Sequence, residues 1–398
     1  MKIKSLDARE VLDSRGMWTV GVRMVLADGA YAVDSVPQGK STGFHEALSL
    51  PAAQAVRNIN KVIAPKLRGK NFASQTALDD FLIRLDGAPN KKKLGANAIL
   101  AASMAFLRAS AKVKKVPLWK HVNDVYLHEG KSRSGDPVKP GAPRLFMNVV
   151  NGGLHAGNNL HFQEYLIIPK TKSVKASVEI GTTLYHALGA MLARTKGKVA
   201  TNIGDEGGYA PDFKDDLEPF RILQKIAKQL RLGKAIDFGL DAAATDARLS
   251  KEDLMHFYKK FTTAVRPLYL EDPFPEEQFE DFAVLTEKYG KETWIAGDDL
   301  TTTNVRRMER ADAEESVNAV IIKPNQIGSV SEALDAVRAA RQYGWKVVAS
   351  HRSGETNDSF IADFAWGVRA DGIKLGAPAR GERVAKYNRL IEIEHEAR

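Results

Sequence analysis

The feature that most constrains the fold of this chain is a repeat in its second half, where short apolar runs end in charged residues. A helix-like stretch, such as EEQFEDFAVLTEKYG or SVSEALDAVRAARQYG, separates one run from the next. The runs end at Asp241, Glu271, Asp298, Lys323, His351 and Lys374, in steps of 30, 27, 25, 28 and 23 residues. A strand plus a helix in about 25 to 30 residues is the unit of a (β/α) barrel, whose functional groups lie at the carboxyl ends of the strands.

A doubly wound open sheet shows the same alternation of strands and helices. We favour the closed barrel because charged residues follow so many successive strands. A barrel gathers all of these strand ends around one mouth, whereas an open sheet spreads them along an edge.

The length of 398 residues exceeds the usual size of one domain, so we expect two domains or a barrel with an appendage. The chain begins with strand-like alternation, including TVGVRMVLADG with a hairpin signal at its DG end, and continues with helical periods. The stretch HEGKSRSGDPVKPGAP is rich in Gly, Ser, Pro and charge, which is typical of a linker. We predict an N-terminal α+β domain over 1–127, a linker over 128–143 and a catalytic barrel over 144–398.

Composition excludes several classes of chemistry. The chain has no cysteine, which excludes disulfides, thiolate nucleophiles and cysteine-bound zinc. The N-terminus MKIKSLDARE lacks the apolar segment of a secretory signal. The longest apolar stretch, Leu94–Leu107, is too short to span a bilayer and contains Asn97, so we expect a buried helix there. We expect a cytoplasmic protein without a membrane partner.

The formal net charge of +9 raises the question of a nucleic-acid partner. Lys and Arg are spread along the whole chain, and the tightest cluster, Lys91–Lys93, is predicted to lie in a surface turn. Basic and aromatic residues do not interleave as they do where bases stack. We therefore expect no nucleic-acid partner, and we assign the charge to a solvated surface and a site for a small anionic substrate.

Three of the strand-end residues are carboxylates, namely Asp241, Glu271 and Asp298. A lone Asp at a strand end is often a helix N-cap, but three uncompensated carboxylates around one mouth repel one another and need a cation. With oxygen ligands alone, a hard ion such as Mg²⁺ is the natural candidate.

The next strand ends carry cations: Lys323, then His351 and Arg352, then Lys374. An arginine can clamp a phosphate with two parallel hydrogen bonds. A lysine beside a metal ion and a second lysine has a lowered pKa, which makes Lys323 a candidate base for removing a proton next to a carboxylate. The alternative for any one of these lysines is a simple pair with a buried carboxylate.

Two further segments precede the repeat. NGGLHAGNN followed by FQEYLIIP places Gln163 and Glu164 at a strand, and NIGDEGGYAP places Glu206 in a glycine-flanked turn where backbone can approach a ligand. A carboxylic acid there could protonate a leaving hydroxyl group. We interpret His155 as a polar substrate contact and leave His161 unassigned.

The chain resembles the enolase (phosphopyruvate hydratase) family from end to end, in the ordered segments VLDSRG, STGFHEAL, NKKKLGANAIL, MNVVNGG, FQEY, GDEGG, GLDAA, LEDPF, GDDLTTTN, IIKPNQIGS, SHRSGETND and KLGAPARGER. The resemblance implies an α/β fold in which a smaller α+β domain, with a mobile lid loop, caps a modified (β/α)8 TIM-type barrel. It implies the reversible dehydration of 2-phosphoglycerate to phosphoenolpyruvate.

The resemblance also implies roles for individual residues. Lys323 becomes the base and Glu206 the acid, with Glu164 assisting at the hydroxyl end. Substrate phosphate and carboxylate would be held by His155, Gln163, His351, Arg352, Ser353 and Lys374. Magnesium would be bound by Asp241, Glu271 and Asp298, and a second magnesium ion by Ser41 of the lid once substrate is present. These roles follow the pattern of the wider superfamily, which uses a lysine or histidine base together with one or two magnesium ions.

The chain departs from the family pattern at two places. The lid usually reads close to PSGASTG, but here it is PQGKSTG, and we expect the Lys40 side chain to face solvent. Gly21 and Glu392 stand where many family dimers pair a glutamate with an arginine across the interface. We therefore expect a homodimer, or an oligomer built from dimers, with altered interface details.

Three alternatives are kept. The altered lid would suit an enolase paralogue that acts on a phosphonate or other carboxylate. A sugar-acid dehydratase or racemase of the wider superfamily would not need Arg352, Ser353 and the lid serine. A non-catalytic binding protein would not need Lys323 or Glu206.

Overall fold

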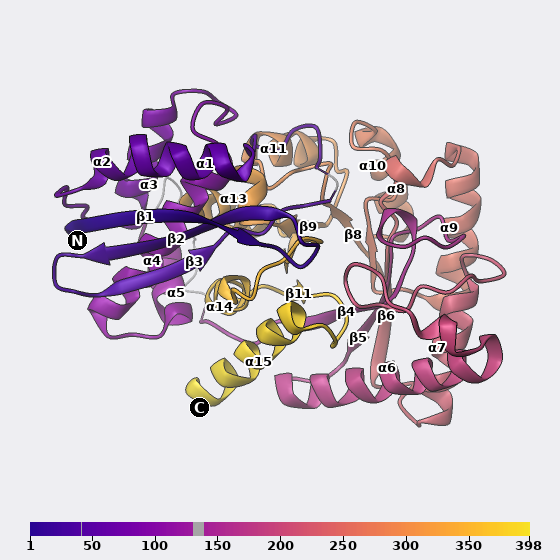
Figure 1. The fold of residues 1–398 in the computed structure, drawn as a ribbon. Coiled ribbons are helices and arrows are strands. Elements are labelled where there is room, and N and C mark those ends of the chain that lie inside the picture. Colours follow the sequence, from indigo (N-terminus) through magenta and orange to yellow (C-terminus); the bar gives the residue numbers. More distant parts are fainter. Residues whose placement is uncertain (41, 130–138) are drawn as a thin grey trace.

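The computed structural model describes residues 1–40, 42–129 and 139–398. The chain begins with a three-stranded antiparallel sheet in the order β1 (Ile3–Leu12), β2 (Trp18–Leu26) and β3 (Tyr31–Ser35), which lies at the left of Figure 1. The predicted hairpin is confirmed: β2 and β3 are joined by a turn in which the Leu26 amide donates to the Ala30 carbonyl at 2.8 Å. Gly29 has a φ of +91°, which a residue with a side chain rarely adopts.

Helices follow this sheet along the chain, and some of them pack against its strands. Their bounds are α1 (Ala52–Asn58), a π-helical turn (Ile59–Ile63), α2 (Ala64–Leu67), α3 (Gln75–Asp86), α4 (Ala96–Lys114) and α5 (Leu118–His128). The apolar stretch predicted as a buried helix is α4, in which every residue from Ala96 to Leu107 is buried. This helix packs against β2 and β3, so its all-round apolar surface is explained by burial between layers.

The second half of the chain forms a closed eight-stranded barrel, at the right of Figure 1. Its strands are β4 (Arg144–Asn151), β5 (Glu164–Pro169), β6 (Ile236–Asp241), β7 (Tyr269–Glu271), β8 (Trp294–Gly297), β9 (Ala319–Ile322), β10 (Lys346–Ser350) and β11 (Gly372–Lys374). All six predicted apolar runs are strands, β6 to β11. The barrel is modified because β5 runs antiparallel to both of its neighbours, while the remaining pairs are parallel.

An outer layer of helices surrounds the barrel, joined by short turns that include α8 (Ala244–Ala247) and α12 (Pro324–Ile327). The main helices are α6 (Val174–Lys196), α7 (Glu218–Gln229), α9 (Lys251–Val265), α10 (Phe279–Tyr289), α11 (Val305–Ala313), α13 (Val330–Gln342), α14 (Phe360–Gly367) and α15 (Gly381–Glu396). In Figure 1, α6 and α7 lie below the barrel and α15 lies beneath the junction with the N-terminal layer.

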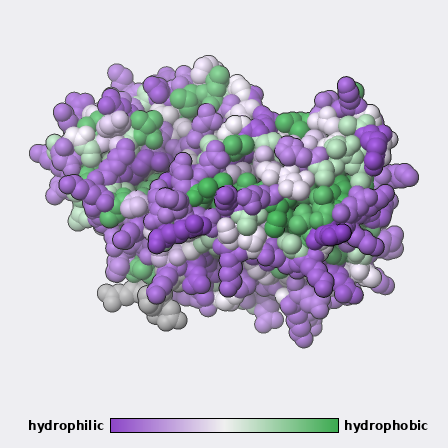
Figure 2. All heavy atoms as spheres, turned by 90° about the horizontal axis from the view of Figure 1, so that it is seen from below, coloured by the Kyte–Doolittle hydropathy of each residue, from purple (hydrophilic) through white to green (hydrophobic). Residues whose placement is uncertain are grey.

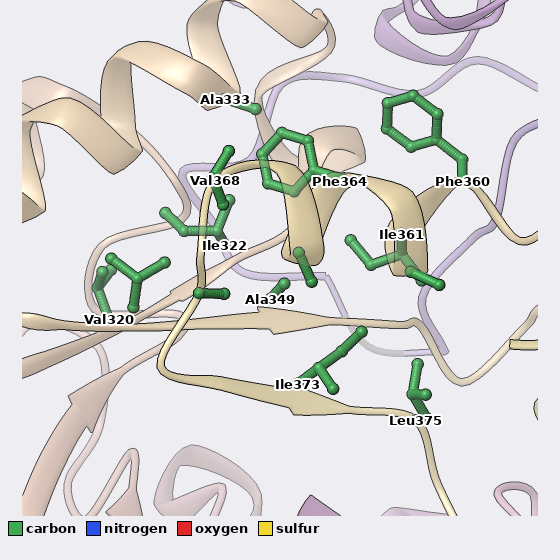
Figure 3. Close-up of a cluster of buried hydrophobic side chains, with 14 of the residues drawn as sticks. Val320, Ile322, Ala333, Ala349, Phe360, Ile361, Phe364, Val368, Ile373 and Leu375 are labelled. Carbon is green, nitrogen blue, oxygen red and sulfur yellow. The ribbon is translucent and has the colours of Figure 1, made fainter. Parts of the chain in front are cut away.

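Alternation along the strands divides the core into two layers. One face of the strands forms a separate buried cluster of Phe146, Leu166, Ile168, Tyr269, Ala296, Ala319, Ile321 and Val348. The alternate residues pack against the helices: in Figure 3, Val320 and Ile322 of β9 and Ala349 of β10 face Phe364 of α14 and Ala333 of α13. This two-sided burial is what makes the strand sequences almost wholly apolar up to their polar ends.

Among the predictions for residues 1–143, one is not tested by the structure and one is wrong. The division at 1–127, 128–143 and 144–398 stays a prediction, and residues 130–138 of the expected linker lie outside the described residues. The prediction that Lys91 lies in a surface turn is wrong. Its side chain is 2% exposed and pairs with Glu332 of α13 at 2.9 Å, whereas Lys92 and Lys93 are exposed.

Hydrophilic and hydrophobic side chains both appear on the surface of the protein. The face shown in Figure 2 is mostly hydrophilic, with smaller hydrophobic areas between the charged side chains. In the described part of the chain, none of the helices combines the length and the apolar character needed to cross a membrane.

Candidate active site

The predicted strand-end residues meet at one end of the barrel. Asp241, Glu271 and Lys374 are the last residues of β6, β7 and β11, and Asp298, Lys323 and His351 follow β8, β9 and β10 directly. Because these strands are parallel, their carboxyl ends lie around the same mouth. Gln163 and Glu164 reach this mouth from the opposite direction, since β5 is antiparallel and its first residues lie there.

Glu206 and His155 come from loops rather than strands. Glu206 is 2% exposed and accepts a hydrogen bond from the Asn148 side chain at 3.1 Å. The glycines around it are required by close packing, because a Cβ atom on Gly208 would lie 2.8 Å from the Asn151 side-chain oxygen. The sequence GDEGG thus lets the loop press against β4 and carry a carboxylate inward.

Most of the predicted site residues line a single cavity. Its walls include His155, Gln163, Glu164, Glu206, Asp241, Asp298, Lys323, His351, Arg352, Ser353 and Lys374. Glu271 is fully buried beside this cavity, where it contacts Lys374. Ser41 lies outside the described residues. His161 lies apart from the cavity lining, since its ring pairs with Asp216 at 2.9 Å.

Lys374 is the electrostatic centre of one side of the site. Its ammonium group contacts Glu271 at 2.6 Å, Asp241 at 2.9 Å and Glu164 at 3.2 Å. One positive charge cannot balance three buried carboxylates. Burial and the neighbouring Asp241 accordingly raise the pKa of Glu271 to about 8.

This excess of carboxylate fits a divalent cation. Among the described residues, one oxygen of Glu271 and one of Glu164 are buried without a hydrogen-bond partner. Burial and Asp298 also raise the pKa of Asp299 to about 8, so the same deficit of positive charge extends to the next strand end. The available donors are oxygen atoms and imidazole, with no thiolate anywhere in the sequence.

The predicted triad of metal ligands is brought to one mouth, but it is not the tightest cluster. Within the described ranges, the groups of three whose ligand atoms lie within 4.8 Å of one another are His155, Glu164 and Glu206, and Asp272, Asp298 and Asp299. Lysines explain the difference: Lys374 bonds both Asp241 and Glu271, and Lys323 pairs with Asp298. The structure therefore presents these carboxylates with ammonium partners.

Lys323 forms the opposite side of the site. Its ammonium group pairs with Asp298, which also accepts a hydrogen bond from the Gln326 side chain at 2.8 Å. Burial acts to lower the pKa of Lys323, but the Asp298 charge outweighs it and raises the pKa above the ordinary lysine value. The charges of Arg352 and Lys374 act in the same direction as burial, and the lowered pKa expected for Lys323 beside a metal ion stays a prediction.

Glu164 and Glu206 form a coupled pair of carboxylates. Their oxygens lie within 4.8 Å of each other, and burial followed by the charge of Glu206 raises the pKa of Glu164 well above its usual range. Burial acts to raise the pKa of Glu206 as well, but the neighbouring His351 and His155 outweigh it and hold that pKa well below its usual range. Such a pair can donate a proton to a leaving group.

The turn after β10 carries the residues expected to hold the phosphate. Arg352 is 5% exposed and forms two parallel hydrogen bonds to Glu46, at 3.0 and 3.1 Å, and one to Asn325 at 3.1 Å. Burial lowers the pKa of His351 to about 3, so its ring is neutral at neutral pH. The Ser353 hydroxyl accepts a hydrogen bond from the Lys40 amide at 2.7 Å.

Several supporting residues were missed by reasoning from the sequence. Arg383 of α15 is fully buried and donates to the carbonyls of Arg352 and Ser353, both at 2.6 Å, which fixes the turn after β10. Glu46 and Asn148 were also missed. Glu46 and Arg383 lie within the motifs STGFHEAL and KLGAPARGER, so the family pattern was the available signal, but it did not say which side chain each would contact.

The expectation that Lys40 faces solvent is met only in part. Its side chain is 42% exposed, but the ammonium group donates to the Leu154 carbonyl at 2.7 Å and to Asp205 at 2.8 Å. Asp205 directly precedes Glu206. The lid residue that departs from the family pattern is therefore bonded beside the site and does not line the cavity.

Comparisons with known proteins agree with this arrangement. The family model described as "Enolase, N-terminal domain" matches residues 3–122, and "Enolase, C-terminal TIM barrel domain" matches 141–249 and 244–398. Proteins named enolase are similar along nearly the whole chain. Those of Solanum lycopersicum and Methanopyrus kandleri are 40% and 41% identical, with 99% of this chain and 95% and 96% of theirs covered. The Methanocaldococcus jannaschii enolase is 42% identical, with 99% and 95% covered.

An eight-stranded barrel with one reversed strand, the convergence of carboxylates and lysines at its mouth, and these full-length matches lead to one conclusion: the chain belongs to the enolase family.

Proposed function

We propose that this chain catalyses the reversible removal of water from 2-phosphoglycerate to give phosphoenolpyruvate, with Lys323 as the base and Glu206 as the acid. The observation that carries this proposal is that Lys323 and the pair Glu164–Glu206 line one cavity from different parts of the barrel. A base and an acid around the same small cavity can act on adjacent carbons of one substrate, which is what the elimination of water requires.

We further propose that the divalent cation is Mg²⁺ and that Asp241, Glu271 and Asp298 hold it. The support is the buried excess of carboxylate oxygen described above. When bound, the ion neutralises the charge that develops on the substrate carboxylate as its neighbouring proton leaves. A second Mg²⁺ held partly by Ser41 is proposed from the family resemblance.

Lys323 removes the proton from the carbon beside the carboxylate. For this it has to be neutral, and the charge of Asp298 acts against this by raising its pKa. Burial acts in the opposite direction, so the pKa of Lys323 would be lower if Asp298 were bonded to another group. Glu206, with Glu164 beside it, donates the proton with which the departing hydroxyl group leaves as water.

The remaining cavity residues bind and orient the substrate. Arg352 and Ser353 would hold the phosphate, with His351 between them and the acid pair. Lys374 and Gln163 would hold the carboxylate, and His155 would contact the hydroxyl end. Their burial excludes water, which strengthens each of these interactions relative to the same contacts in solvent.

The alternative of a paralogue with a different substrate is not favoured. It was suggested by the altered lid, but the Lys40 ammonium is bonded to Asp205 and Leu154 and does not line the cavity. The full-length relatives are also named enolase.

The test is a direct assay. Purified protein with Mg²⁺ and 2-phosphoglycerate is followed by the ultraviolet absorbance of the enol product, beside the variant Lys323→Ala. We expect a magnesium-dependent rise that falls by about 10²- to 10⁴-fold in the variant. No rise, or a rise that Lys323→Ala leaves unchanged, would sink the proposal.

We also propose that the chain forms a dimer whose interface lacks the usual ion pair. Gly21 is buried in β2, where an added Cβ atom would lie 2.9 Å from the Val11 side chain, and Glu392 instead pairs with Arg389 of its own helix at 3.2 Å. The molar mass in solution, from light scattering, tests this: a monomer at micromolar concentration would contradict it.

A further inference from the structure

Lys40 connects three loops at the mouth of the barrel. Its ammonium group bonds the Leu154 carbonyl at 2.7 Å and the Asp205 carboxylate at 2.8 Å. Leu154 belongs to the loop after β4, and Asp205 to the loop that follows α6. A single lysine side chain therefore ties the segment that contains it to two other segments that are distant in sequence.

The backbone of the same segment is anchored elsewhere, on the turn after β10. Gln38 and Gly354 exchange two backbone hydrogen bonds, at 2.8 and 2.9 Å, and the Lys40 amide donates to Ser353. Gly39, between these anchors, forms part of the cavity wall. Residues 38–40 are thus held to one loop by backbone and to two others by the Lys40 side chain.

The loops that Lys40 reaches carry catalytic groups one residue further along. Leu154 precedes His155, and Asp205 precedes Glu206. The two loops are linked to each other, since the Asp205 amide donates to the His155 carbonyl at 3.3 Å and the His155 ring lies 3.7 Å from Glu206. A displacement of Asp205 or Leu154 would therefore move the acid and its histidine neighbour.

The bond depends on the residue at which this lid departs from the family pattern. An alanine, which the usual sequence PSGASTG has at this position, cannot donate such a bond. The pair is only partly buried, with side chains 42% and 29% exposed for Lys40 and Asp205. An ion pair that is this exposed contributes little to the free energy of unfolding. We therefore expect it to affect the position of the loops and not the stability of the fold.

We propose that Lys40 is a positioning residue: through Asp205 and the Leu154 carbonyl it latches residues 38–40 to the loops bearing Glu206 and His155 before substrate binds. The catalytic meaning of this latch rests on the proposed function of the site. The existence of the latch does not rest on that function, because each of its bonds joins two groups of the protein itself.

The first test therefore uses ligand-free protein and needs no turnover. Hydrogen exchange of the amides in 38–40, 153–156 and 204–206 is compared between the unmodified protein, Lys40→Met, and the control Lys92→Met, which removes a different exposed lysine. We expect exchange to be about two- to fivefold faster in all three segments in Lys40→Met only. Equal exchange in Lys40→Met and the unmodified protein would overturn the proposal.

The second test is kinetic and separates a latch from a direct substrate contact. We expect Lys40→Met to raise KM for 2-phosphoglycerate about two- to fivefold with little change in kcat, and Lys40→Arg to restore it. In an Asp205→Ala background, Lys40→Met should have a smaller further effect on KM, because only the bond to the Leu154 carbonyl is left to lose. An equal rise in both backgrounds would show that Lys40 contacts substrate and would overturn the latch. If the unmodified protein does not turn over this substrate, the proposed function fails while the exchange experiment still decides the latch.

Discussion

Glu164 lies directly opposite Asp241 in the ladder between β5 and β6, although Glu164 begins its strand and Asp241 ends its own. The reversal of β5 thereby places a member of the acid pair beside a candidate metal ligand. Lys374 bonds both carboxylates, at 3.2 and 2.9 Å. The charge state of the acid pair and the binding of a cation are consequently linked through one lysine.

Replacing this lysine should make the fold depend on a cation. In Lys374→Met, three buried carboxylates lose their ammonium partner, which costs about 3–5 kcal/mol of the free energy of unfolding in a metal-free buffer. Mg²⁺ should then raise the thermal midpoint more in the variant than in the unmodified protein. Melting curves with EDTA and with Mg²⁺ measure this, with Lys92→Met as the control. A variant as stable as the control in EDTA would contradict the role of Lys374 as counter-ion.

The identity of the metal ligands can be tested within the cavity lining. We expect Asp241→Asn to raise the Mg²⁺ concentration for half-maximal activity by about tenfold or more, because a charged oxygen ligand is lost. Asp246 also lines the cavity but is not a predicted ligand, so Asp246→Asn is the matched control. Magnesium titrations of both variants decide the point, and a larger effect in Asp246→Asn would refute the assignment.

The closeness of the Glu164 and Glu206 carboxylates leads to a prediction that infrared spectroscopy can test. The charge of Glu206 helps raise the pKa of Glu164, second only to burial, so Glu206→Gln should lower that pKa. Glu164 is then protonated over a narrower range and ionises at lower pH than in the unmodified protein. Infrared difference spectra of the protonated carboxyl band, recorded across pH, measure the shift, and turnover should fall by about 10²- to 10⁴-fold. A band unchanged by Glu206→Gln would mean that the pair is uncoupled.

A buried histidine far from the chemistry should make stability depend on pH. Burial lowers the pKa of His121 in α5 from its ordinary 6.5 to about 4. Between these values the unfolded chain binds a proton that the folded protein does not, so stability is complete above about pH 6.5 and falls as the pH drops toward 4. The loss is on the order of 3 kcal/mol.

His121→Gln should therefore lose less of its thermal midpoint than the unmodified protein between pH 7.5 and pH 4.5. His128 is 71% exposed and lies on the same helix, which makes His128→Gln the control. If both variants track the unmodified protein, His121 is not the source of the pH dependence.

The strand ends of the barrel could be predicted from the sequence because each apolar run stops at a polar residue, and parallel strands bring those stops together. The direction of β5 could not, since an antiparallel strand that is buried on both faces has the same apolar pattern as a parallel one. Burial of Lys91 was mispredicted for a related reason: its partner Glu332 is more than two hundred residues away, and a lysine cluster after Pro89 has the composition of a surface turn.

The pKa values and the supporting contacts of the site could not be predicted, because they depend on tertiary contacts that the spacing of residues along the sequence does not reveal. The sequence places Lys323 near carboxylates, but only the packing of Asp298 against its ammonium group decides that the pKa is raised. Similarly, Arg383 is the third residue of α15, where its sequence neighbours give no sign of burial, and its burial under the turn after β10 comes from the return of α15 to the barrel.

The bond between Arg352 and Glu46 joins the barrel to the N-terminal half of the protein. The arginine belongs to the barrel, while the glutamate belongs to the segment that precedes the N-terminal helices, and both are buried. A barrel expressed by itself would keep this guanidinium group without its carboxylate, at the place proposed to bind the substrate phosphate. The two halves are therefore not interchangeable modules, and a chimaera that joins this barrel to another N-terminal half must inherit residues 46 and 352 together.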